Sequence, residues 1–366
     1  MDGGPRQVIE PGGSWTAQFT INQNAATLWY HPHPLGKTGE QVYRGLAGLF
    51  IIEDDISRRL SIPMTYGVDD IPLIIQDKRF SSDGTFIYRL TMPDVMQGLI
   101  GNAMLVNGAI NPYLEVGRSR VRFRILNGLN LSVYRLMLNN ESSFFQIASD
   151  GGFFEQPVAM NSLVLSPGER AEIVVDFSQY HTDESLYLRA MIPNGDEYDI
   201  MRFKVTGKEV ADSKLPDSLS VFAPIPVSES ARTRTFTMQT MGPGMMRGMG
   251  RGMLSINGKK MDLRRIDETV RLGDTEIWEI YNQPAGMMNF PHSFHIHDIQ
   301  FQILSRDGKR PPKNEMGWKD TVLIWPGEVV RVITKFEDYT GIYMYHCHLL
   351  EHEDDGMMGQ FEVIDR

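Results

Sequence analysis

The pattern of apolar and polar positions predicts a chain built mainly from β-strands. After the turn Pro11-Gly12-Gly13, apolar side chains alternate with other residues over positions 15–21, and residues 27–30 form the next apolar run. Alternation with a period of two is typical of strands that bury one face. Helical periodicity is weak except in residues 262–270 and in the turn after His348. We therefore expect an all-β fold of packed sandwiches.

A turn followed by an apolar strand occurs three times. The turns are Pro11-Gly12-Gly13, Pro167-Gly168-Glu169 and Pro326-Gly327-Glu328, at intervals of about 160 residues, and apolar runs at 173–177 and 332–336 follow the second and third. A repeat of this length indicates related domains rather than short repeat units. We expect three β domains, of which the first is partial.

Two changes in composition suggest where the domains meet. The charged run Glu53-Asp54-Asp55 follows an apolar segment, and residues 207–232 are rich in Ser and Pro. The predicted organisation is a partial first domain over 1–56, a second domain without metal ligands over 57–207, a linker over 208–232 and a third domain over 233–366.

Eight of the nine histidines fall into three clusters: His31 and His33; His292, His295 and His297; and His346, His348 and His352. A single histidine is usually an ordinary core or surface residue, but each cluster contains an H-x-H pair. Residues i and i+2 of a strand share one face, so each pair presents two imidazoles to one space. The clusters therefore favour metal binding. The segment of the middle repeat that matches the third-domain cluster has no histidine.

The single cysteine, Cys347, lies between His346 and His348. On a strand its side chain faces away from both neighbours. His352 and Met357 follow at intervals that a short loop can fold around one ion, and His292 is out of phase with the H-x-H pair that follows it. Two histidines, a cysteine and a weak methionine ligand are typical of a blue copper site.

The remaining six histidines, His31, His33, His295, His297, His346 and His348, are predicted to face a second centre. Six imidazoles are enough for more than one metal ion. The bonds from Cys347 to its two neighbours would then join the two centres by a covalent path for single electrons.

Composition narrows the classes of function. A net charge of −10 argues against a nucleic-acid surface and suits neutral or cationic small substrates. No apolar run approaches the roughly 20 residues of a membrane span, and one cysteine excludes an intramolecular disulfide. The first residues show neither the basic nor the apolar part of a secretory signal, so the chain as given is expected in the cytoplasm.

Several motifs together resemble one family. They are Trp29-Tyr30-His31-Pro32-His33, Lys37-Thr38-Gly39, Gly45-Leu46-Ala47-Gly48, His292-Ser293-Phe294-His295-Ile296-His297 and Gly317-Trp318-Lys319-Asp320-Thr321. Over essentially its whole length the chain is similar to the multicopper oxidases of the laccase, bilirubin oxidase and bacterial cuprous oxidase group, with the copper-efflux branch nearest. The resemblance implies tandem cupredoxin domains, electron uptake from phenols, aromatic amines or cuprous ion at a type 1 copper, and dioxygen reduction at a trinuclear copper cluster. Members of the family are often periplasmic or secreted.

The resemblance also implies a role for each ligand. Type 1 copper would be held by His292, Cys347, His352 and Met357, and type 2 copper by His295. One type 3 copper would be held by His31 and His348, and the other by His33, His297 and His346. The family has four H-x-H motifs where this chain has three. We expect the missing pair just before Met1, which makes the chain an N-terminally truncated form, and doubt full occupancy of the type 2 and type 3 positions.

Carboxylates and methionines supply further candidates. Glu353 and Asp2 resemble family carboxylates that deliver protons to oxygen intermediates, whereas the alternative for Glu353 is a solvated acidic turn. The Met-rich stretch over 238–253 is either a set of soft ligands for cuprous ion or a flexible loop. His181 is expected on the surface.

Two other functions compete with an oxidase. The first is a copper-binding electron-transfer protein with an intact type 1 site and an incomplete cluster. The second is a two-site reductase such as copper nitrite reductase, although its single type 2 copper would leave the histidines on both sides of Cys347 unexplained. A partial domain exposes strand edges, so self-association is also expected.

Overall fold

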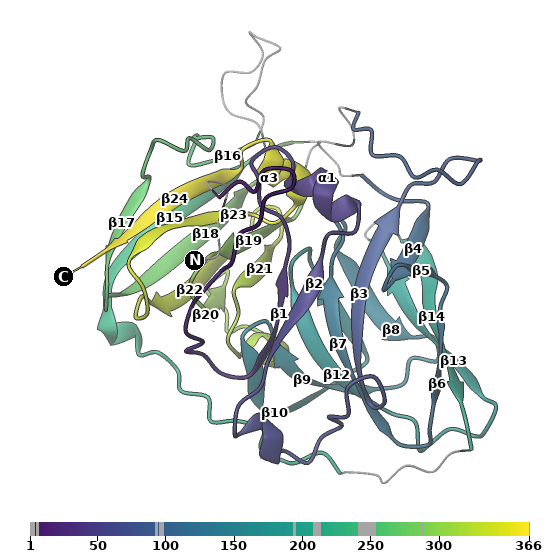
Figure 1. Cartoon of the computed structure of the whole chain (residues 1–366). Helices are drawn as coiled ribbons and strands as arrows, with labels where there is room; N and C mark the ends of the chain where they lie inside the picture. The colour runs from purple at the N-terminus through teal and green to yellow at the C-terminus, as the bar shows by residue number, and fades with distance from the viewer. Residues whose placement is uncertain are drawn as a thin grey trace.

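The computed structural model describes residue 4, residues 7–91, residue 94 and residues 99–192, 195–207, 214–240, 254–286 and 289–365. In Figure 1 these residues form two β-sandwiches side by side, with the short strands β1 and β2 lying between them. The all-β prediction is confirmed. Within the described residues, no helix has both the length and the apolar composition needed to cross a bilayer.

The middle part of the chain forms one sandwich of two sheets. Its larger sheet contains, in spatial order, β10 (Gly152–Met160), β9 (Phe144–Ser149), β12 (Arg170–Asp176), β7 (Arg120–Asn127), β3 (Asp70–Lys78), β4 (Ala103–Val106) and β5 (Ala109–Ile110). The smaller sheet contains β11 (Ser162–Leu165), β8 (Tyr134–Leu138), β13 (Ser185–Met191), β14 (Glu197–Val205) and β6 (Tyr113–Val116). Alternate side chains of both sheets meet in one apolar core that includes Phe123, Phe177 and Phe203.

The C-terminal part forms the second sandwich. One sheet contains β16 (Ser255–Ile256), β15 (Ser230–Gln239), β18 (Thr275–Gln283), β22 (Val329–Lys335) and β20 (Phe301–Arg306). The other contains β17 (Glu268–Arg271), β24 (Met358–Ile364), β23 (Gly341–Cys347), β19 (His292–Ile296) and β21 (Thr321–Ile324). The fully buried Trp278 lies at the centre of the core, within 6 Å of the ring centroids of Phe236, Tyr345 and Phe361.

The N-terminal region contributes a small sheet. Strand β1 (Ala26–Tyr30) pairs with β2 (Gly48–Ile52), and helix α1 (Thr38–Tyr43) lies between them in sequence. Further helical segments are η2 (Ser57–Arg59), η3 (Val227–Glu229), η5 (Lys313–Glu315) and α3 (Leu350–Asp354).

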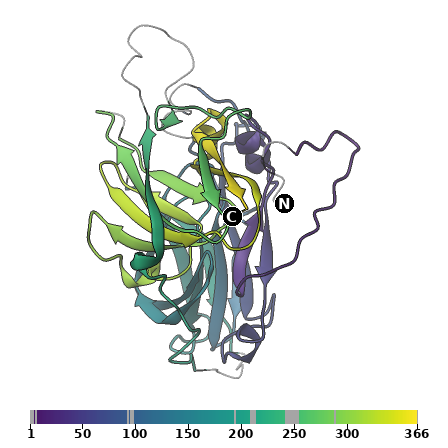
Figure 2. The same cartoon turned by 90° about the vertical axis from the view of Figure 1, so that its left-hand side faces the viewer.

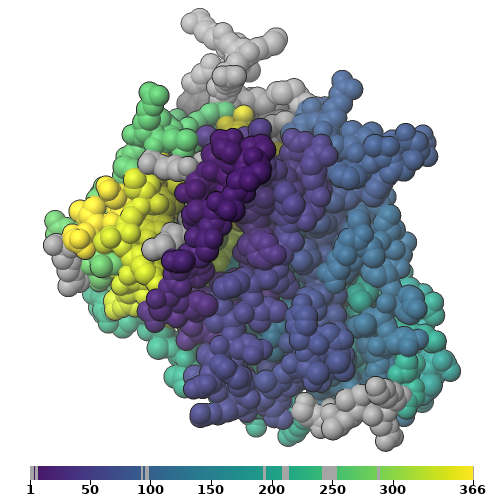
Figure 3. Space-filling model, viewed as in Figure 1, coloured from purple at the N-terminus to yellow at the C-terminus, as the bar shows by residue number. Residues whose placement is uncertain are grey.

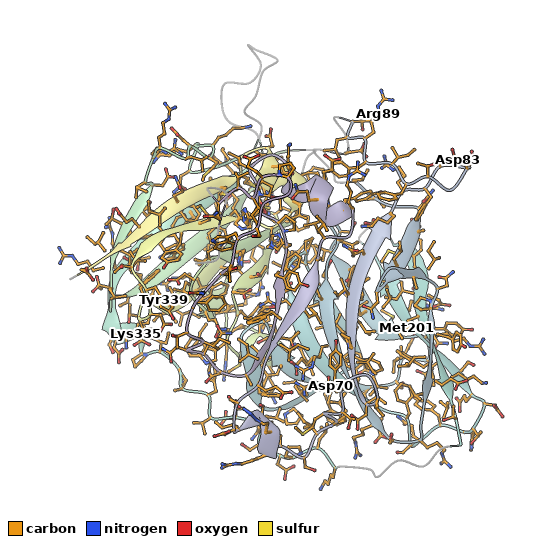
Figure 4. The ribbon with its side chains drawn as sticks, viewed as in Figure 1. Asp70, Asp83, Arg89, Met201, Lys335 and Tyr339 are labelled. Atoms are coloured by element: carbon orange, nitrogen blue, oxygen red, sulfur yellow. The ribbon has the colours of Figure 1, made fainter. Side chains whose placement is uncertain are left out.

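The strand predicted over residues 15–21 is wrong. Among the described residues β1 pairs only with β2, so this alternating segment has no neighbour to complete its backbone hydrogen bonds. Trp15 and Phe19 are 42% and 52% exposed. The segment stands off the body in Figure 2 and crosses the C-terminal sandwich in Figure 3. Tyr339, labelled in Figure 4, donates a 2.8 Å hydrogen bond to the carbonyl of Thr20.

One of the two helical expectations also fails. Residues 262–270 form a turn that leads into β17. Pairing with β24 supplies the backbone hydrogen bonds of β17 that a helix would otherwise have made within itself. The helix after His348 is confirmed as α3. The apolar runs at 27–30, 173–177 and 332–336 largely coincide with β1, β12 and β22.

A buried cluster of charges joins β1 to the middle sandwich. Arg124 donates to both carboxylate oxygens of Asp70 at 2.7 to 3.0 Å, and to Glu172 at 3.1 Å. Thr27 of β1 donates to Glu172 at 2.6 Å, and Arg122 pairs with the same carboxylate. All five side chains are buried. Each charge therefore depends on its partners, because water does not reach it.

We predict that Arg124→Met destabilises the protein by about 3 to 5 kcal/mol, because it leaves Asp70 and Glu172 with one cation fewer in a buried site. Denaturant unfolding monitored by circular dichroism measures the loss. Arg189 pairs with Asp199 on the surface at 2.7 Å, so Arg189→Met should cost less than about 1 kcal/mol. Equal losses for the two variants would contradict the buried-cluster argument.

Candidate metal centres

Strand β23 separates two groups of candidate ligands. It pairs with β19 so that Cys347 lies opposite Phe294, and His346 lies opposite His295. Because neighbouring side chains of a strand point to opposite faces, Cys347 enters the core of the C-terminal sandwich while His346 points out of it. Helix α3 then turns the chain back, so that His352 reaches the side of Cys347.

The first group consists of His292, Cys347 and His352, all completely buried. Its Nδ1 atoms lie 3.4 and 3.9 Å from the Cys347 Sγ atom and 3.3 Å from each other. Three donors at these separations surround a point about 2 Å from each, which is a normal metal–ligand bond length. A thiolate with two imidazoles is also the donor set that copper favours. The residues therefore fit a copper ion.

Surrounding contacts hold this group together. The His292 Nε2 atom lies 3.2 Å from the Thr240 hydroxyl, which directs its Nδ1 atom towards Cys347. Met357 is buried, and its carbonyl accepts a 3.0 Å hydrogen bond from the Cys347 amide. The Met357 amide in turn donates to the His352 carbonyl at 2.9 Å. The loop that contains Cys347, His352 and Met357 is thus closed by its own backbone hydrogen bonds.

Burial favours the neutral forms of Cys347 and His292. It raises the pKa of the Cys347 thiol to about 12. Burial, with a contribution from His352, also lowers the pKa of His292 well below its usual value. A bound cation would therefore meet a neutral His292 imidazole and displace the thiol proton of Cys347.

The second group contains His33, His297 and His346, brought together from three distant segments. The Nε2 atom of His346 lies 3.0 Å from that of His297 and 3.4 Å from that of His33. On the other side of its ring, the Nδ1 atom of His346 lies 3.0 Å from the Cys347 carbonyl oxygen. This contact leaves the Nε2 atom directed at the other histidines.

His31, His295 and His348 border the second group. The His348 ring centroid lies 5.4 Å from that of His31 and 5.5 Å from that of His295, and His295 lies 5.3 Å from His346. The His31 Nδ1 atom is 2.9 Å from the Pro32 carbonyl oxygen, and the ring stacks on Trp29. Burial lowers the pKa of His31 to about 3 and that of His348 well below its usual value. All six predicted histidines therefore border one region.

Glu353 lies beneath this histidine cluster and is completely buried. Its carboxylate oxygens lie 3.2 Å from the His346 Nδ1 atom and 3.5 Å from that of His33. Burial raises its pKa well above the usual value, because the low-dielectric surroundings disfavour the charged carboxylate. The interpretation of this segment as a solvated acidic turn is wrong for Glu353 and for Glu351, which is 2% exposed and accepts a 2.7 Å hydrogen bond from Asn130.

Other sequence candidates lie elsewhere. Asp2 and most of the Met-rich stretch fall outside the described residues. Met238 belongs to β15 and is buried in the core, so it is neither part of a flexible loop nor an accessible ligand for cuprous ion. His181 is exposed, as predicted.

The sequence reasoning missed a charged network beside His295. Arg170 of β12 donates to both carboxylate oxygens of Asp320, at 2.7 and 2.5 Å. Lys319 pairs with Asp150 at 2.8 Å and with Glu169 at 3.1 Å. The pKa of Lys319 is raised despite burial because these carboxylates surround it. Two features of the sequence could have indicated this network: the Lys319-Asp320 pair inside a family motif, and Arg170 at the start of an apolar strand.

Comparisons with known proteins agree with this geometry. Residues 1–57 and 229–366 match two family models, each described as multicopper oxidase. The multicopper oxidase mco of Staphylococcus haemolyticus is 41% identical over 363 residues, which cover 99% of this chain and 74% of that protein. This chain belongs to the multicopper oxidase family.

Further relatives extend the comparison. The laccase of Bacillus stratosphericus is 34% identical, with 95% of this chain and 73% of the laccase covered. The solved structure of a laccase-like multicopper oxidase from Ochrobactrum sp. matches with a TM-score of 0.89 and 36% identity, over 99% of this chain and 82% of that one. The protein is therefore a copper-dependent oxidoreductase with cupredoxin-like sandwiches.

We predict that Cys347 in the native, metal-free protein reacts with iodoacetamide at pH 8 more than about 100-fold slower than in the unfolded protein. The thiol is completely buried, and its raised pKa leaves little thiolate. Mass spectrometry should show one label per chain only after unfolding, and none for Cys347→Ser. Rapid labelling of the native protein would show that the ligand pocket is open.

Proposed function

We propose that this multicopper oxidase takes single electrons from a small reductant at a type 1 site and uses them to reduce dioxygen to water at a histidine cluster. One observation carries the proposal: a single strand places Cys347 3.4 Å from the His292 Nδ1 atom and its neighbour His346 3.0 Å from the His297 Nε2 atom, on the opposite face. The two candidate centres are thus joined by a few bonds of one backbone.

The proposed ligand assignment is the one that the family resemblance implies, and two compact groups, His292 with Cys347 and His352, and His33 with His297 and His346, support it. His292, Cys347 and His352 would hold type 1 copper, with Met357 as the weak axial ligand. His33, His297 and His346 would hold one type 3 copper, His31 and His348 would contribute to the other, and His295 to type 2 copper. Copper, when bound, supplies one-electron redox chemistry at the first site and dioxygen reduction at the cluster.

The protein supplies the connection between the sites. The backbone bonds from Cys347 to its neighbours His346 and His348 connect the thiol to two histidines of the cluster. The 3.0 Å contact between the Cys347 carbonyl oxygen and the His346 Nδ1 atom provides a second, shorter route to the same ring. Both routes lie among buried residues, which exclude water from the path.

Glu353 is the proposed proton donor. Reduction of dioxygen to water consumes protons, and a carboxyl group close to the rings of His33 and His346 can deliver them. Burial raises the pKa of Glu353 well above that of an exposed glutamate, which favours the protonated form that can donate a proton.

Phenols and aromatic amines are the favoured reductants, and cuprous ion is the alternative. The net charge of −10 suits neutral or cationic substrates. The Ochrobactrum relative, whose reported oxidase activity is towards lignin model compounds and lignosulfonate, supports the phenolic class.

We predict different losses from substitutions in the two centres of the copper-loaded protein. Cys347→Ser should abolish the blue absorption band and reduce phenol oxidation by more than about 100-fold, because the thiolate is the strongest type 1 ligand. His33→Gln should keep the blue band but lower the copper content and oxygen uptake. Optical spectra, copper analysis and an oxygen electrode measure the three quantities.

His181→Gln is the matched control, because this histidine is exposed and lies outside the clusters. It should change none of the three quantities. A wild-type chain with a blue band, one copper ion and no oxygen uptake would contradict the oxidase proposal and favour an electron-transfer protein.

A further inference from the structure

The middle sandwich supplies none of the candidate ligands, yet one of its turns touches the histidine cluster. This turn, residues 166–170, lies between β11 and β12 and is tied to the end of β7 by a 3.0 Å hydrogen bond from the Gly168 amide to the Asn127 carbonyl. A Cβ atom at Gly168 would lie 2.7 Å from the His348 Cδ2 atom and 2.8 Å from its Cγ atom. The His348 ring therefore packs directly against peptide backbone.

The other two Pro-Gly turns show that this contact with a histidine is not simply a consequence of the turn's backbone conformation. Gly168 has a φ of +85° and Gly327 a φ of +82°, so both occupy the left-handed region that favours glycine. At Gly327, however, the nearest atom to an added Cβ is Pro284 Cγ at 3.6 Å, which is an ordinary contact. At Gly12 there is nothing within 4 Å. Only the middle turn places its glycine against a histidine.

The same turn also holds the backbone beside His348. The Ser293 hydroxyl donates a 2.8 Å hydrogen bond to the Pro167 carbonyl and lies 2.9 Å from the Ser166 hydroxyl. The Ser293 carbonyl accepts a hydrogen bond from the His348 amide at 2.5 Å. The ring and the amide of His348 are thus positioned from one turn.

A second series of hydrogen bonds, called here the arginine arm, runs from this turn through Arg170 and Asp320 to His295. Arg170 donates to the Gly168 carbonyl at 2.9 Å and to both carboxylate oxygens of Asp320. The Asp320 carbonyl oxygen lies 2.8 Å from the His295 Nδ1 atom, a contact that directs the Nε2 atom of this ring into the cluster. The Thr321 hydroxyl, which donates to Asp320, lies 3.0 Å from the same Nδ1 atom.

We propose that the turn over residues 166–170 is a positioning element for the copper cluster: Gly168 sets the ring of His348 by close backbone contact, and Arg170 sets the ring of His295 through Asp320. The inference rests on the proposed function, because it concerns how the cluster ligands are held. Neither residue is a ligand. Metal sites tolerate errors of about 0.5 Å in ligand position, and outer contacts typically change metal affinity by 10- to 100-fold.

The glycine pair provides the sharpest test. In the copper-loaded protein, Gly168→Ala should keep the blue band while cluster copper binds about 10- to 100-fold more weakly. Gly327→Ala imposes the same backbone strain without touching a histidine, so it should leave the blue band and the affinity for cluster copper unchanged. Copper content as a function of free copper, together with electron spin resonance of the type 2 signal, provides the readout.

Histidine ring NMR of the metal-free protein tests the positioning independently of copper. Gly168→Ala should shift the ring signals of His348, whereas Gly327→Ala should not. If the wild-type cluster binds no copper, the proposed function fails, but the ring signals still decide this inference. Unchanged His348 signals in Gly168→Ala, or equal changes in both variants, would overturn it.

The arginine arm is tested with Arg170→Lys, which keeps the charge but loses the two-pronged contact with Asp320. It should shift the His295 ring signals and weaken cluster copper. Arg306→Lys is the control, because Arg306 makes a similar two-pronged contact with Glu315, at 2.6 and 2.8 Å. Equal shifts of the His295 ring signals in Arg170→Lys and Arg306→Lys would contradict the proposed role of Arg170.

Discussion

The two-residue period of β23 is the constraint on which the rest of the site depends. It sends the side chain of Cys347 into the core of the C-terminal sandwich and that of His346 to the opposite side. His348 directly follows the strand, where its amide donates to the Ser293 carbonyl. A register shift of one residue would exchange the two faces and destroy both ligand groups. Pairing with β19 on one side and β24 on the other prevents such a shift, so the sheet itself sets the separation of the two centres.

The two centres differ in what surrounds them. The first is enclosed by the sandwich core, where apolar neighbours raise the pKa of Cys347 and lower that of His292. The second lies where β1, the middle sandwich and the C-terminal sandwich meet, and its rings depend on contacts that cross these boundaries. Burial lowers the pKa of His346 and His348 there too, with a further contribution from neighbouring imidazoles. The first group comes from the C-terminal sandwich alone, whereas the second also needs the segment around β1.

Buried charges specify how those segments meet. Lys319 and Arg170 are enclosed with carboxylates from both sandwiches, and Arg124 joins β1 to the same region through Glu172. Such clusters add little net stability, because desolvation offsets most of the attraction, but a shifted interface would leave charges unpaired. The middle sandwich therefore matters to the site through its ion pairs and its turn, although it has no candidate ligand.

The sequence alone determined the features set by local spacing. Strand alternation and the H-x-H pairs pointed to the candidate ligands around Cys347, and the repeated Pro-Gly turns indicated related β domains. The tertiary structure decided what depends on distant neighbours. Residues 15–21 form no strand because no described strand pairs with them, and Glu353 is buried because distant segments pack around α3. The roles of Gly168 and Arg170 were equally invisible, since a local pattern does not show which distant ring a turn will contact.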